Sequence, residues 1–204
     1  MEKQNWQAQF KCEVEKQLSV LNKSQESKDS AIETLLDNYY AKVESIREAL
    51  DKVFKLDWKS KNQWEASIVK MALYLWEYEG RFSFCINILC FLLVLNGHDL
   101  SIDRGRNYAT SFGDVETVDA STKCKFLVAH GLEVFDEKKN KKLEEFRELR
   151  NNIAHYKFIL EDDGKIKVYN NKTKNWEEAP ILQRHGELMF FAAEMLQILW
   201  QCIS

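Results

Sequence analysis

Proline and glycine are scarce in this chain, which has one proline and seven glycines in 204 residues. All-β folds need frequent turns, and turns depend on these two residue types, so the scarcity argues against such a fold. It favours long helical segments. Hydrophobic residues make up 45% of the chain and charged residues 30%, an ordinary globular balance that excludes disordered and low-complexity classes.

The chain also lacks the patterns of a secreted, zinc-binding or membrane-spanning protein. None of its five cysteines forms a Cys-x-x-Cys pair, so we expect neither a zinc site nor a disulfide framework. The longest apolar run, 82–95, has about 14 residues and is shorter than a membrane span requires. Residues 1–21 show no signal-peptide pattern. We therefore expect a cytoplasmic protein with reduced cysteines, without cofactor, metal or membrane partner.

Charge of one sign does not dominate, because 29 basic side chains stand against 32 acidic ones. A net charge of -3 argues against nucleic-acid binding by the whole surface, but it permits a local basic site. From Glu137 to Arg150 there are six basic and four acidic side chains, a local balance of +2. This segment either guides RNA or is a solvated helix face.

Hydrophobic spacing predicts two helices in residues 1–60. Trp6, Phe10, Val14, Leu18 and Leu21 form one stripe, and apolar residues in 29–54 follow a heptad spacing. The polar stretch 24–30 would be the turn between them. The pair is either a coiled-coil arm or an integral part of the bundle formed by residues 61–204.

The remaining chain predicts a helical domain with one β insertion. We expect helices over 61–95, 137–155 and 181–202, with a shorter helix capped by Ser121. A loop spans about 97–121, and long loops are often functional. Asp163-Gly164 favours a hairpin turn within 157–177. The fold class expected is all-α, with an N-terminal helix pair and a small β-hairpin before the last helix.

The most informative segment lies at the end of the 137–155 helix. It reads Arg150-Asn151-x-x-x-His155. With 7 arginines, 13 asparagines and 4 histidines in the chain, about 0.01 such matches are expected by chance. The other histidines have no motif partner and are interpreted as structural.

These residue types suit metal-independent RNA cleavage. A histidine transfers protons near neutral pH, and an arginine fork matches phosphate oxygens. Asn151 lies one helical turn before His155, where it could orient the imidazole. Arg150 lies about 140° from His155 around an ideal helix. Either the arginine wraps round, or His155 leaves the helical path, or two copies of the motif meet across a two-fold axis, which we favour.

This motif resembles that of the HEPN superfamily, whose members are small helical bundles with R-x4–6-H near the end of a late helix. The resemblance implies a homodimeric endoribonuclease similar to toxins of toxin–antitoxin modules and to antiviral RNases, with Arg150, Asn151 and His155 as catalytic residues. It implies RNA as substrate, a 2′,3′-cyclic phosphate product and, as a further partner, an antitoxin. The alternative is a non-catalytic nucleotide- or protein-binding module.

Several neighbouring residues allow two interpretations each. Arg147, Tyr156 and Lys157 are expected to bind substrate, although Tyr156 is more readily interpreted as packing on the hairpin. Arg150 could instead pair with Glu145 or Glu148 on its own helix.

Two other features could serve the site. Glu77 and Glu79 interrupt the apolar 61–95 helix, where their charge needs compensation. We favour a pair with Arg81 or a polar dimer rim over the alternative, a carboxylate that reaches the site of Arg150 and His155. Arg104 and Arg106 stand beside Tyr108 in the 97–121 loop, a mix that single-stranded RNA readers use.

Overall fold

A computed structural model describes residues 3–21, 63–102 and 107–203 of the chain. The described chain is mostly helical, with a small three-stranded antiparallel sheet before the final long helix. Its helices are α1 (Lys3–Leu21), α3 (Gln63–Trp76), η1 (Glu77–Phe82), α4 (Ser83–Leu95), α5 (Phe112–Thr117), α6 (Ala120–Ala129), η2 (Glu133–Phe135), α7 (Lys141–Ala154) and α8 (Ile181–Ile203). Its strands are β1 (Phe158–Leu160), β2 (Ile166–Asn170) and β3 (Asn175–Glu178).

Helix α1 belongs to the core of the bundle. The predicted stripe is confirmed for Trp6, Phe10, Val14 and Leu18, all of which are buried. The Trp6 ring packs against Phe191 of α8. The predicted heptad segment 29–54, the turn at 24–30 and the boundary near residue 60 lie outside the described residues.

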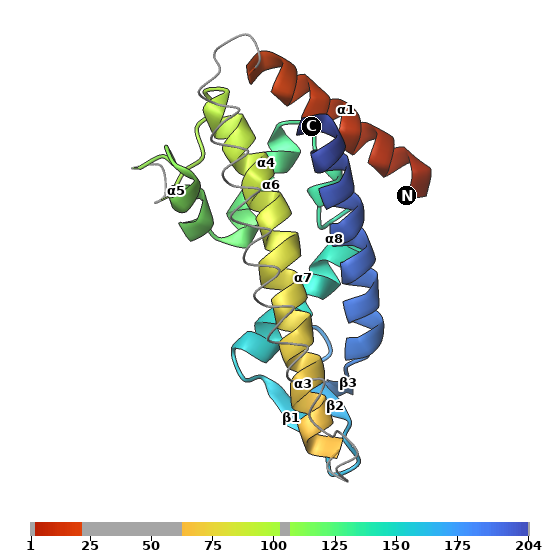
Figure 1. The fold of residues 1–204 in the computed structure, drawn as a ribbon. Coiled ribbons are helices and arrows are strands. Elements are labelled where there is room, and N and C mark those ends of the chain that lie inside the picture. Colours follow the sequence, from red (N-terminus) through yellow and green to blue (C-terminus); the bar gives the residue numbers. More distant parts are fainter. Residues whose placement is uncertain (1–2, 22–62, 103–106, 204) are drawn as a thin grey trace.

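The predicted 61–95 helix is a continuous helix made of α3, η1 and α4, and it runs beside α8 along the length of the bundle (Figure 1). Its middle turn, η1, is a π-helix, a geometry common at functional sites. By length and composition Glu65–Leu95 could cross a membrane, yet 61% of its apolar window is buried inside the structure, as in a core helix. The apolar run of α4 is buried, as predicted.

The loop predicted over 97–121 contains a helix that the sequence reading missed. Ser111 caps α5 in a capping box, accepting from the Asp114 amide while the Asp114 carboxylate accepts from the Ser111 amide. The cap predicted at Ser121 is also wrong, because Asp119 caps α6 by accepting from Thr122 N–H at 3.0 Å.

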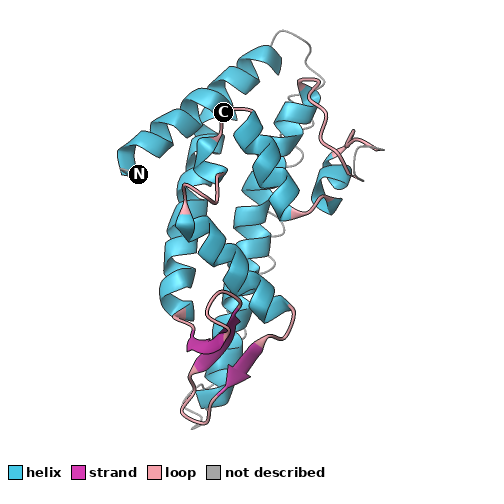
Figure 2. Cartoon of the chain, turned by 180° about the vertical axis from the view of Figure 1, so that it is seen from behind, coloured by secondary structure: helices cyan, strands magenta, loops and turns pink. Residues whose placement is uncertain are grey.

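The predicted β insertion is present as the sheet β1-β2-β3 at one end of the bundle (Figure 2). Gly164 adopts a φ of 77° in the β1–β2 connection, as the Asp163-Gly164 pair predicts. The connection is longer than a two-residue turn, because the ladder ends at the Leu160–Ile166 pair. Ser67 of α3 donates to the Gly164 carbonyl at 2.7 Å, which fastens the turn to the bundle.

The cysteines of the described chain are free thiols, and three of them are buried. They pack as small hydrophobic residues, as the sequence indicated. Burial raises the pKa of the Cys124 thiol to about 12, and it raises those of Cys85 and Cys90 further. These thiols are therefore protonated at neutral pH.

Candidate functional site

Helix α7 ends at the motif, and the residue directly after the motif has a left-handed backbone. His155 is the C-cap, and its φ of -102° and ψ of 17° depart from helical values. Tyr156 follows with a φ of 56°. The Lys157 amide then donates back to the Asn152 carbonyl at 2.7 Å, closing a Schellman motif. His155 thus leaves the helical path, one of the three routes considered from the sequence.

Tyr156 is an unusual residue for this position. A left-handed conformation costs about 1–2 kcal/mol in residues other than glycine, and such strain clusters at functional sites. Its side chain is 85% exposed, so the interpretation that it packs on the hairpin is wrong. A solvent-facing aromatic residue with a strained backbone therefore directly follows His155.

Arg150 is held by two partners on its own side of the helix. Its Nε donates to Glu79 Oε1 at 2.5 Å, and its Nη1 donates to Asn151 Oδ1 at 3.0 Å. The guanidinium also lies 6.0 Å from the centre of the buried Tyr78 ring. Asn151 therefore contacts Arg150 in a single chain rather than the His155 ring that it was predicted to orient.

The pairing of Arg150 corrects two expectations. Neither Glu145 nor Glu148 is its partner, because they form ion pairs with Arg184 and Lys172. The carboxylate that reaches it comes from η1. For the two η1 glutamates the sequence favours a pair with Arg81 or a polar dimer rim over a contact with the site.

That preference holds for one glutamate and not for the other. Glu77 is 1% exposed and lies 3.5 Å from Arg81, while burial raises its pKa. Glu79 reaches the motif instead. The two glutamates differ because they are two positions apart on the same helix and therefore point in different directions.

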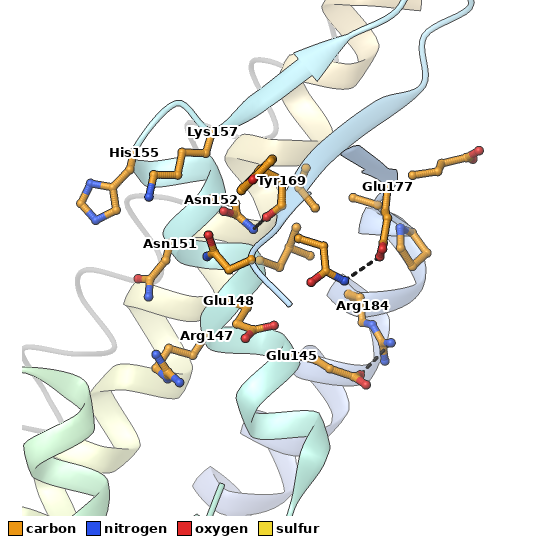
Figure 3. A pocket seen from close by; sticks show the side chains of 17 residues that line it. Glu145, Arg147, Glu148, Asn151, Asn152, His155, Lys157, Tyr169, Glu177 and Arg184 are labelled. Atoms are coloured by element: carbon orange, nitrogen blue, oxygen red, sulfur yellow. Dashed lines mark hydrogen bonds and ion pairs between the residues drawn. The ribbon is translucent and has the colours of Figure 1, made fainter. Parts of the chain in front are cut away.

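Two cavities flank the end of α7. The first, of about 470 Å³, lies between α7, the sheet and the start of α8, and we call it the sheet-side cavity. Figure 3 shows His155 and Asn151 at its edge, pointing away from the strands. Its lining consists of Glu145, Arg147, Glu148, Leu149, Asn151, Asn152, His155, Lys157, Val168, Tyr169, Asn170, Asn171, Glu177, Glu178, Ala179, Pro180 and Arg184.

The second cavity, of about 510 Å³, lies between α7, η1, α4 and the segment that joins α5 to α6, and we call it the bundle-side cavity. Arg150 and Glu79 line it together. Arg147 and Asn151 line both cavities. Its lining consists of Tyr78, Glu79, Ser83, Asn87, Glu116, Val118, Asp119, Ala120, Ser121, Lys123, Arg147, Arg150 and Asn151.

The sheet-side cavity is acidic in its interior. Four glutamates line it, against three basic side chains besides His155. Of those three, Arg184 is paired with Glu145 at 2.7 Å and Arg147 is paired outside the cavity. Lys157 makes no ion pair within the described part of the chain. An anionic group would therefore be less repelled at the edge that carries His155 and Lys157 than beside the glutamates.

The basic run from Lys138 to Arg150 is largely paired with glutamates. Arg147, predicted to bind substrate, makes a two-pronged pair with Glu137 at 2.6 and 2.9 Å. Lys139 pairs with Glu133 at 2.9 Å. These pairs favour the solvated helix face over the RNA guide. Glu137 also precedes α7, which begins at Lys141 rather than at the predicted 137.

The loop segment predicted to bind single-stranded RNA is only partly described. Arg104 and Arg106 lie outside the described residues, and Tyr108 is exposed. No group of three or more histidine, cysteine, aspartate or glutamate side chains in residues 3–21, 63–102 and 107–203 is arranged to hold a metal ion.

The sequence reading missed two residues at the base of the bundle-side cavity, Lys123 and Asn87. Both are buried, and Lys123 Nζ donates to Asn87 Oδ1 at 2.7 Å. Asn87 left a signal, because it interrupts the apolar run of α4. The sequence gives no such signal for Lys123, since nothing in a local pattern separates it from the exposed Lys125.

No protein-family model, curated protein or solved structure matches this chain.

Proposed function

We propose that this protein is a metal-independent endoribonuclease of HEPN type that cleaves RNA to a 2′,3′-cyclic phosphate. The observation that carries the proposal is the exposed His155 at the C-cap of α7, next to an arginine–asparagine pair. A late helix bearing this motif in a mostly helical bundle supports a HEPN-like fold. Lys157 and the exposed ring of Tyr156 add a cation and a stacking surface for RNA.

The proposed reaction needs one proton acceptor and one proton donor. The ribose 2′-oxygen attacks the adjacent phosphorus while His155 accepts the hydroxyl proton. The bond from phosphorus to the 5′-oxygen breaks, and that oxygen takes a proton from a protonated histidine. Arg150 neutralises the charge that develops on the phosphate oxygens.

We propose a homodimer because Arg150 and His155 do not face the same cavity in a single chain. Arg150 lines the bundle-side cavity, and His155 lines the sheet-side cavity. A second copy related by a two-fold axis would bring two motifs into one cleft. The partner's His155 would then donate the proton to the leaving oxygen.

Cleavage by purified protein tests this proposal. We expect the full chain to cut labelled RNA in the presence of EDTA, leaving cyclic phosphate ends that mass spectrometry identifies. His155→Ala should cut at least about 100-fold more slowly. His98→Ala is the matched control, since His98 lines neither cavity and stacks on His130. Equal cleavage by His155→Ala and the unchanged chain would contradict the proposal.

The biological setting proposed is a toxin or antiviral-defence effector in the cytoplasm, restrained by an antitoxin protein. The alternative is a non-catalytic nucleotide- or protein-binding module. One observation favours that alternative, namely that the Arg150 guanidinium already forms an ion pair with Glu79 in a single chain. An Arg150→Ala/His155→Ala double variant separates the two functions. Loss of cellular toxicity or defence supports the enzyme, and full retention supports the module.

A further inference from the structure

The base of the bundle-side cavity holds a buried, incompletely bonded lysine. Lys123 is 6% exposed and Asn87 is 7% exposed. Lys123 Nζ donates one hydrogen bond to Asn87 Oδ1, and this is the only hydrogen bond of either side chain within the described residues. An ammonium has three N–H donors, and a carboxamide has two. Within the described residues, two N–H groups on each nitrogen therefore have no protein acceptor.

These donors open onto the cavity and are not sealed in the core. Burial lowers the pKa of Lys123, because the charged form is desolvated there. The carboxylates around the cavity do not serve as acceptors for it. Glu79 accepts from Arg150, Asp119 accepts from Thr122, and Glu116 is exposed at the cavity mouth. A ligand that presents acceptor atoms would complete the bonding of this base.

The charge pattern of the cavity decides which acceptor-bearing ligand fits. Three carboxylates, Glu79, Glu116 and Asp119, line the cavity with three basic side chains, Lys123, Arg147 and Arg150. Arg147 and Arg150 are already paired with glutamates, so the lining offers no surplus positive charge for a phosphate group. A neutral planar group needs no such charge. The walls include the ring of Tyr78 and the side chain of Val118, both apolar surfaces suited to a flat heterocycle.

We propose that the bundle-side cavity binds guanine or uracil, the nucleobases with an oxygen where adenine and cytosine carry an amino group, through Lys123 and Asn87. Lysine commonly donates to guanine O6 and N7, and uracil presents O4 in a similar way. The base of the cavity directs the N–H donors of Lys123 Nζ and Asn87 Nδ2 at the ligand, and at the position of guanine O6 and uracil O4, adenine and cytosine present further N–H donors instead.

This inference rests on the proposed function for its setting. Arg150 stands at the edge of the same cavity, so the base bound there would belong to a nucleotide next to the cut bond. Lys123 and Asn87 would then determine where the RNA is cut without taking part in the chemistry.

Calorimetric binding of GMP, UMP, AMP and CMP to the full-length His155→Ala protein tests the cavity separately from cleavage. We expect GMP or UMP to bind about tenfold more tightly than AMP and CMP, and the four arms separate guanine from uracil. Lys123→Met should abolish that preference. Lys125→Met, which changes an exposed lysine on the same helix, should preserve it.

The Asn87→Asp variant tests whether misfolding explains a lost preference in Lys123→Met. It gives Lys123 an ionic partner and removes the amide donors, so we expect an intact fold by circular dichroism and lost preference. Equal binding of all four nucleotides, or an unchanged preference in Lys123→Met, would overturn the inference. If the preference depends on Lys123 but the unchanged chain cuts no RNA, the ribonuclease proposal fails and the base site stands.

Discussion

The two sides of helix α7 use charged groups in opposite ways. On the sheet side, His155 and Lys157 are exposed and make no ion pair within the described residues. On the bundle side, Arg150 is paired with Glu79, and Lys123 is buried against Asn87. Exposed, unpaired side chains are accessible to a ligand from solvent, whereas buried and directed donors suit recognition of a ligand that enters a cavity. The comparison shows that the two sides of one helix offer different kinds of polar group.

Removing Arg150 should give the largest effect after the loss of His155. We expect Arg150→Ala to slow RNA cleavage about 100-fold, because it removes the charge that stabilises the phosphate oxygens. Its ion pair is partly exposed, so the melting temperature should change little. Single-turnover rates and thermal melts measure both. A variant that cuts at the normal rate would show that the bundle side takes no part in the reaction.

Tyr156→Gly should change stability and RNA binding in opposite directions. Glycine adopts the left-handed conformation without strain, so the free energy of unfolding should rise by about 1 kcal/mol. Loss of a stacking ring should weaken RNA binding about tenfold. Urea denaturation and fluorescence anisotropy measure the two effects. Weaker binding together with lower stability would indicate a packing role after all.

Glu79→Gln weakens the contact that keeps Arg150 on the bundle side. A carboxylate competes with RNA phosphate for the guanidinium, so we expect RNA to bind about threefold more tightly, within the range of an exposed ion pair. Glu133→Gln, which weakens the exposed pair with Lys139, is the control. Weaker RNA binding in Glu79→Gln would show instead that Glu79 holds Arg150 in its binding position.

The pH dependence of stability should distinguish the buried lysine from the exposed ones, with the smallest effect of the four. Burial holds the pKa of Lys123 below its usual 10.5. The unfolded chain therefore binds more protons than the folded chain between these two values, and the free energy of unfolding rises with pH across that interval. Lys123→Met should flatten this rise in urea titrations from about pH 7 to pH 10. Lys125→Met should keep it, and identical slopes in both variants would contradict the buried charge.

Local patterns predicted most of the secondary structure. The buried run of α4, the stripe of α1 and the turn at Gly164 all follow from residue spacing or from backbone freedom, which act over a few residues. The capping box at Ser111 and Asp114 was equally local and was overlooked. The ends of helices were less well predicted, since a turn at Asp136–Asn140 precedes α7 where the sequence predicts that the helix begins.

The sequence by itself determined the chemistry available at the end of α7. Arg150, Asn151 and His155 are contiguous enough for their types and spacing to be informative, and the helix end follows from the same stretch. Only the tertiary structure decided their partners. Glu79 reaches Arg150 from 71 residues away, and Lys123 meets Asn87 across 36 residues. Such pairs form because packed helices bring distant positions together, and no local spacing encodes which side chains will meet.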